Sequence, residues 1–97
     1  YFARQGKSGG AWMSSFRVQE RFDGAVTPHV VNVMNIPAPP AGEIATVSLD
    51  DAITMFHELG HGLHGLLSDV SYPSIAGTAV SRDFVEFPAQ IMEHYLL

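Results

Sequence analysis

The sequence contains no cysteine, and this absence excludes two kinds of structural support. Disulfide bonds cannot form, and a zinc site built from thiolates is impossible. A chain without cysteine also suits a reducing compartment, and we therefore expect a cytoplasmic location.

Basic residues and long apolar runs are scarce as well. Five lysines and arginines stand against 10 acidic residues, which gives a net charge of −5 over 97 residues. Because no basic cluster exists, we expect no nucleic-acid partner. No apolar run reaches the roughly 18 residues that a membrane helix needs, and no signal-peptide pattern is visible. We therefore expect no membrane association.

The length allows one domain at most. The chain starts at Tyr1 without an initiator methionine, and it stops at Leu97 inside a stretch that still looks helical. We therefore expect residues 1–97 to be a single fragment of a larger protein. Such a fragment exposes surfaces that the remainder would cover, and these surfaces favour self-association.

Residues 57–61 read His-Glu-Leu-Gly-His, which is the most informative pattern in the chain. Two histidines four residues apart lie roughly 40° apart around a helix, so both imidazoles can reach one metal ion. The intervening Glu58 can reach a water molecule at the same metal. This H-E-x-x-H pattern is typical of zinc peptidases, with His57 and His61 as ligands and Glu58 as the general base.

A long helix over residues 49–68 should carry this motif. Ser48 and Asp51 form a predicted capping box at its start. Apolar residues cover most of its circumference, which predicts a buried helix. Three glycines inside it each cost about 1 kcal/mol relative to alanine, and they predict a close approach to the helix backbone: Gly60, Gly62 and Gly65.

The other expected elements are shorter. We predict a strand over residues 27–36 and a second short strand over residues 43–49. Residues 11–22 are ambiguous between a strand and an irregular segment. A second helix should lie within residues 83–97, with Pro88 near its first turn. We expect the aromatic and sulfur side chains of the N-terminal part to be core residues: Trp12, Met13 and Phe16.

A catalytic zinc ion usually has three protein ligands. Glu86 is the preferred third ligand, because it follows a loop long enough to return the chain antiparallel to the first helix. Its neighbours are apolar, and a carboxylate held among apolar side chains needs a partner such as a metal. Glu93 lies two turns further on and is better placed to orient a ligating histidine. His64 shares the histidine stripe, but we expect a hydrogen-bonded packing residue there.

Three segments resemble the thimet oligopeptidase family of zinc metallopeptidases. Residues 56–64 resemble its active-site helix, residues 81–90 its second signature, and residues 6–13 a further segment of its bacterial members. The form of the second signature is most similar to the peptidyl-dipeptidase (dipeptidyl carboxypeptidase) branch, with the oligopeptidase A branch next.

The resemblance implies that His57, His61 and Glu86 bind one Zn²⁺ ion and that Glu58 is the catalytic carboxylate. It further implies hydrolysis of short peptides, with release of C-terminal dipeptides as one specificity, by a mainly helical catalytic domain. We expect a mainly α fragment with a small β layer, in which a zincin-like active-site helix faces a second ligand-bearing helix.

In the family, the tyrosine and histidine that stabilise the transition state come from a downstream segment, which these 97 residues do not include. The isolated chain should therefore bind zinc but cleave peptides poorly. Two alternatives remain open at this point. One is a non-catalytic zinc-binding remnant, and the other is a different zinc hydrolase on an unrelated fold.

Overall fold

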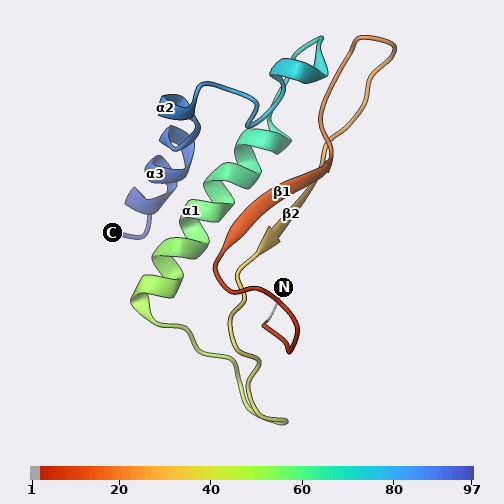
Figure 1. Cartoon of the computed structure of the whole chain (residues 1–97). Helices are drawn as coiled ribbons and strands as arrows, with labels where there is room; N and C mark the ends of the chain where they lie inside the picture. Colours follow the sequence, from red (N-terminus) through yellow and green to blue (C-terminus); the bar gives the residue numbers. More distant parts are fainter. Residues whose placement is uncertain (1–2) are drawn as a thin grey trace.

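The computed structural model describes residues 3–97. One long helix lies between a two-stranded β-ribbon on one side and a short C-terminal helical region on the other. The elements are β1 (Trp12–Arg17), β2 (His29–Val33), α1 (Leu49–Leu66), the 3₁₀ helix η1 (Pro73–Ile75), α2 (Arg82–Val85) and α3 (Phe87–His94). In Figure 1, α1 lies between the ribbon and α3. The expected mainly α architecture with a small β layer is confirmed.

The two strands form an antiparallel pair. The register places Trp12 opposite Val33 and Ser15 opposite Val30, and an irregularity follows at Arg17. The strand predicted over residues 27–36 is confirmed at its centre, and the ambiguous segment 11–22 contains the partner strand. The loop between the strands is tied to the segment after α1, because the Gln19 side-chain amide donates to the Val70 carbonyl and accepts from its N–H.

Helix α1 begins where its sequence predicts. The Ser48 hydroxyl accepts a hydrogen bond from the Asp51 N–H at 3.0 Å, and the Asp51 carboxylate accepts one from the Ser48 N–H at 3.3 Å. This reciprocal capping box satisfies donors that the first turn leaves unpaired. The helix ends at Leu66, two residues before the expected end, and the Leu67 N–H bonds to the Leu63 carbonyl.

Two of the helix glycines mark the surfaces that pack against α1. A Cβ at Gly60 would lie 2.5 Å from the Cα of Ala89 and 2.7 Å from the carbonyl oxygen of Pro88, so only glycine lets α3 come this close. A Cβ at Gly65 would lie 3.0 Å from the Met13 side chain on β1. The predicted close approach to the helix backbone is therefore confirmed on two faces.

The prediction of a buried helix is wrong for its large side chains. Within α1, burial falls on Glu58 and the three glycines, whereas Leu59 and Met55 are about 40% exposed, at 42% and 39%. The expected core role also fails for Trp12 and Phe16, which are 45% and 81% exposed, and Met13 is half-buried. An apolar pattern identifies the side chains that favour burial, but it does not supply the surface that covers them.

The second predicted strand, over residues 43–49, is also wrong. Residues 43–48 form an irregular loop that leads into α1 at Leu49, and the apolar Ile44 in this loop is 90% exposed. Within residues 3–97 the sheet contains only β1 and β2, and this segment pairs with neither of them. A strand forms only where its backbone groups find a partner.

The second helix is present but divided. Pro88 has no N–H to donate to the carbonyl of residue 84, and its ring disfavours a continuous helix across this point. Helix α2 accordingly ends at Val85, Glu86 caps both segments, and α3 starts at Phe87. No helix within residues 3–97 has the length and apolar character needed to cross a membrane.

Candidate metal centre

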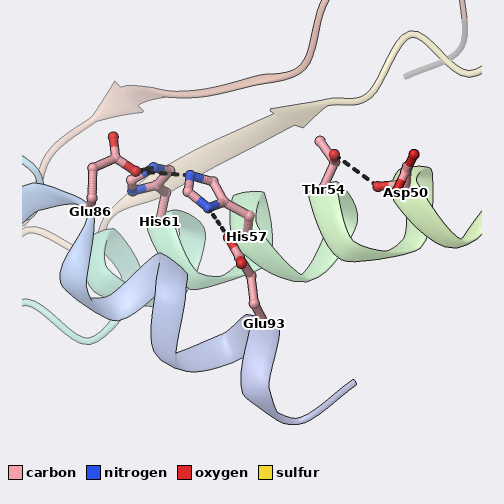
Figure 2. A network of polar contacts seen from close by, with 6 residues as sticks. All are labelled: Asp50, Thr54, His57, His61, Glu86 and Glu93. Atoms are coloured by element: carbon pink, nitrogen blue, oxygen red, sulfur yellow. Dashed lines mark hydrogen bonds and ion pairs between the residues drawn. The ribbon is translucent and has the colours of Figure 1, made fainter. Parts of the chain in front are cut away.

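His57 and His61 lie on the face of α1 that turns toward the junction of α2 and α3. Their four-residue spacing places one imidazole above the other along the helix, and the ring centroids are 4.8 Å apart at 83°. The side chains are 23% and 14% exposed, so both rings are largely shielded from solvent while their Nε2 atoms converge. Figure 2 shows the two rings beside the Glu86 carboxylate.

Glu86 approaches both rings because it occupies the break between α2 and α3. Its Oε2 atom lies 2.9 Å from the Nε2 atom of His57 and 3.3 Å from the Nε2 atom of His61. The side chain is 50% exposed, so the expectation of an enclosing apolar environment is wrong. The rings of its aromatic neighbours Phe84 and Phe87 contact each other at a tilt of 39° and are themselves about half exposed.

These three atoms fit a single cation. One ligand atom from each of His57, His61 and Glu86 lies within 4.8 Å of the others. Tetrahedral zinc with bonds of about 2.0–2.2 Å places its ligand atoms about 3.3 Å apart, which is close to the two distances from Glu86. Two imidazoles and one carboxylate are also the donor set of many catalytic zinc sites.

The hydrogen bonding of His57 strengthens this fit. Its Nδ1 atom lies 2.6 Å from Oε1 of Glu93, and an ionised carboxylate can only accept, so the proton belongs on Nδ1. A neutral His57 then has a lone pair on Nε2, directed at the carboxylate oxygen of Glu86 at 2.9 Å. Two facing lone pairs repel unless a second proton or a cation lies between them. A divalent cation satisfies this pair and His61 together.

Glu58 has a different environment from the three ligand candidates. It is 8% exposed, and within residues 3–97 its carboxylate makes no hydrogen bond or ion pair. It does not belong to the cluster that could hold a metal ion. Its carboxylate oxygens are not among the buried side-chain atoms of residues 3–97 that lack a hydrogen-bond partner, so water or substrate can reach them.

The remaining histidines lie outside the cluster. His64 packs edge-on against Phe84 with ring centroids 6.1 Å apart, and its buried Nδ1 finds no hydrogen-bond partner among residues 3–97. The expected hydrogen bond is therefore missing at Nδ1, although the packing role holds. Burial, and secondarily the neighbouring His61, lower the pKa of His64 below the ordinary histidine value. His29 lies beside the Arg17 guanidinium at 3.0 Å.

A recess of about 180 Å³ adjoins the ligand cluster, and sequence patterns gave no sign of it. Besides His61 and Glu86, it is lined by Met13, Thr78 and Val85. Thr78 belongs to the loop between η1 and α2, and Met13 belongs to β1. No spacing rule relates these positions to the motif, because they come from β1, from the loop before α2 and from α2 itself, which meet only through tertiary packing.

Comparisons with known proteins agree with this geometry. The profile of Peptidase family M3 matches residues 1–97. The chain is 50% identical over 95 residues to the dipeptidyl carboxypeptidase of Escherichia coli, and the match covers 98% of this chain and 14% of that protein. It is 39% identical over 97 residues to oligopeptidase A of the same organism, which covers 97% of this chain and 14% of the relative.

A eukaryotic relative shows the same pattern of coverage. The chain is 35% identical over 96 residues to a thimet-like oligopeptidase of Dictyostelium discoideum, again over 97% of this chain and 14% of the relative. The chain thus spans about one seventh, 14%, of the length of the curated relatives that it matches.

Proposed function

The chain belongs to peptidase family M3, and on that basis we propose that it carries the metal centre of a zinc-dependent peptidase. The proposed reaction is hydrolysis of peptide bonds in short oligopeptides, with release of C-terminal dipeptides as the favoured specificity. One observation carries the proposal, namely that the Nε2 atoms of His57 and His61 and the Oε2 atom of Glu86 converge on one point.

Zinc is the proposed metal because of the donor chemistry. Two imidazoles and one carboxylate, without thiolates, form a set that leaves a coordination position free for catalysis. When bound, the ion acts as a Lewis acid that polarises the scissile carbonyl and makes a water molecule nucleophilic near neutral pH. The proposed stoichiometry is one Zn²⁺ ion per chain, held by His57, His61 and Glu86.

The proposed role of Glu58 is proton transfer. Its carboxylate takes a proton from the attacking water and passes it to the leaving amine. Its place beside His57 in the H-E-x-x-H motif supports this role, because that spacing lets a general base reach a water molecule at the same metal. The neighbouring His57 is held by two carboxylates, so the backbone that carries Glu58 belongs to a well-fixed part of α1.

The whole activity is proposed to need polypeptide beyond these 97 residues. The chain spans 14% of the length of its relatives, and the family resemblance assigns the oxyanion-stabilising side chains to a downstream segment. Loss of one such donor lowers the rate by about 10²- to 10³-fold. The 97-residue chain alone should therefore bind zinc and hydrolyse peptides slowly.

Because the chain spans only 14% of the length of its relatives, a second candidate function is a zinc-binding fragment without catalytic activity. All three proposed ligands lie inside this chain, so the proposed zinc binding would not require the rest of the relatives' length. The two candidates differ in whether this segment can support turnover when the remaining catalytic groups are supplied.

A chimeric enzyme distinguishes the catalytic candidate function from the non-catalytic one. The 97 residues replace the matching segment of the E. coli dipeptidyl carboxypeptidase, and release of dipeptides from a blocked tripeptide is measured with and without a zinc chelator. We expect chelator-sensitive turnover that Glu58→Gln abolishes and that Glu43→Gln, an exposed loop control, leaves unchanged. A folded, zinc-loaded chimera without turnover would leave only the non-catalytic candidate.

A further inference from the structure

His57 is held from two sides by carboxylates that belong to the same short helix region. Glu86 caps α3 and reaches Nε2 at 2.9 Å, whereas Glu93 in the second turn of α3 reaches Nδ1 at 2.6 Å. Seven residues correspond to nearly two helical turns, about 10.5 Å along the axis, so both carboxylates point to the same side of α3. Figure 2 shows the His57 ring between them.

The shorter contact is on the side away from the ligand cluster. Glu93 and His57 are 28% and 23% exposed, whereas Glu86 is 50% exposed, so the Glu93 contact is the better shielded of the two. A hydrogen bond to a charged acceptor in such a place is stronger than a solvent-exposed one. This hydrogen bond can therefore fix both the rotation of the His57 ring and the ring nitrogen that carries the proton.

His61 provides an internal comparison. Its Nε2 atom faces the same Glu86 oxygen, but its buried Nδ1 atom has no hydrogen-bond partner among residues 3–97. The two ligand histidines are thus not equivalent, because only His57 has a carboxylate that selects its tautomer.

We propose that Glu93 is a positioning residue for the metal centre, which locks His57 in the tautomer that presents Nε2 as a ligand. This inference rests on the proposed function, in that the ligand prepared is a zinc ligand. A carboxylate behind a ligating imidazole orients the ring and makes it more basic, and its removal typically weakens metal binding about 10- to 100-fold.

Two readouts test the proposal on the 97-residue chain. Long-range ¹H–¹⁵N NMR correlations of the imidazoles report the tautomer of His57 in the metal-free chain at about pH 8.5, above the ordinary range of histidine titration. Competition with a chromophoric chelator reports the zinc dissociation constant. The variants are Glu93→Ala, Glu93→Gln and, as a control for the loss of one negative charge, Glu43→Gln.

In the unmodified chain we expect His57 to be protonated at Nδ1 and one zinc ion to bind. Glu93→Ala should give a mixture of His57 tautomers and about 10- to 100-fold weaker zinc binding. Glu93→Gln retains an acceptor oxygen and should keep the tautomer with a smaller loss of affinity. Glu43→Gln should change neither readout, and circular dichroism confirms that each variant retains its helices.

The proposal is overturned if folded Glu93→Ala keeps the Nδ1-protonated His57 and binds zinc as tightly as Glu43→Gln. If the unmodified chain binds no zinc, the proposed function fails instead. The tautomer readout needs no metal, so it still decides whether Glu93 sets the state of His57.

Discussion

Three histidines on one stripe of α1 differ in role because their partners differ. Both nitrogens of His57 face carboxylates, His61 has one such contact, and His64 has an aromatic neighbour and no partner at Nδ1. Spacing alone makes all three equally suitable as ligands. The position of Glu86 decides between them, because its carboxylate reaches the first two rings and the ligand cluster does not include His64.

At the residue scale, His64 predicts a specific response to acid. Its pKa is lowered in the folded chain, chiefly by burial, so the unfolded chain takes up a proton first as the pH falls. This uptake lowers the free energy of unfolding. The loss is absent above the ordinary histidine pKa of about 6.5, and it grows as the pH falls toward the lowered pKa of the folded chain. Acid therefore destabilises the folded state through this residue.

Urea unfolding of the metal-free chain at about pH 7.5 and pH 5.5 measures this effect. His64→Gln should lose less stability on acidification than the unmodified chain, because glutamine does not titrate. Both proteins share every other titrating group, so the difference between them isolates His64. Equal losses would show that the environment of His64 does not oppose its protonation.

At the scale of elements, the contact between α1 and α3 sets the geometry of the site. Ala89 is fully buried against Gly60, and it lies between Glu86 and Glu93 in the sequence. The contact therefore lies between the two carboxylates that hold His57. A helix that moved away from α1 at this point would withdraw both carboxylates together.

Substitution of Gly60 tests this dependence. A Cβ at this position would lie 2.5–2.9 Å from three atoms of the α3 backbone, which cannot rotate away, so Gly60→Ala should displace α3. We expect a loss of about 1–3 kcal/mol in unfolding free energy, as for other overpacked contacts, together with weaker zinc binding.

Gly62 provides the matched control on the same helix. A Cβ there would have its nearest neighbour at 3.7 Å, an ordinary contact with Val30. Gly62→Ala should therefore leave zinc binding unchanged and raise stability by up to about 1 kcal/mol through helix propensity. If the two alanine variants behave alike in urea unfolding and zinc titration, the packing of α3 on Gly60 does not set the metal centre.

Local chemistry explains which elements could be predicted from the sequence. The capping box at Ser48, the four-residue spacing of the histidines and the proline at residue 88 act over one or two helical turns. The start of α1 and the placement of Glu86 at a helix start followed from them. The seven-residue spacing, which keeps Glu86 and Glu93 on one helix face, also predicted that Glu93 orients a ligating histidine, and the structure shows that this histidine is His57.

The features that could not be predicted depend on distant neighbours. The expected strand over residues 43–49 pairs with neither β1 nor β2, and no local pattern reveals whether a segment will find a partner. Thr78 comes beside the ligand cluster only through the packing of separate elements. The exposure of Glu86 likewise depends on the placement of its aromatic neighbours Phe84 and Phe87, whose rings contact each other at a tilt and are themselves about half exposed.

At the scale of the whole molecule, the chain is open and its apolar core is small. Its radius of gyration is 15.3 Å, whereas a compact domain of this length has about 12.5 Å. Among residues 3–97 the buried hydrophobic residues are Val33, Ala76 and Ala89, while large side chains such as Phe16 are exposed. The self-association expected from the sequence suits this surface and stays a prediction.

The openness also bears on the proposed catalysis. The three proposed ligands lie close together, yet the Glu86 side chain is half exposed to solvent. Water weakens electrostatic interactions, so an open site stabilises developing charge less well than an enclosed one. This agrees with the proposal that the isolated chain holds zinc but turns over slowly, and that the remaining length of the protein completes the site.

The most direct test of the account is the zinc X-ray absorption spectrum of the loaded 97-residue chain, recorded with Glu86→Ala and His61→Ala alongside. We predict nitrogen and oxygen ligands at about 2.0–2.2 Å, including two imidazoles in the unmodified chain and one in His61→Ala, with a carboxylate lost in Glu86→Ala. A spectrum that neither substitution alters would contradict the assignment of His57, His61 and Glu86 as the metal centre.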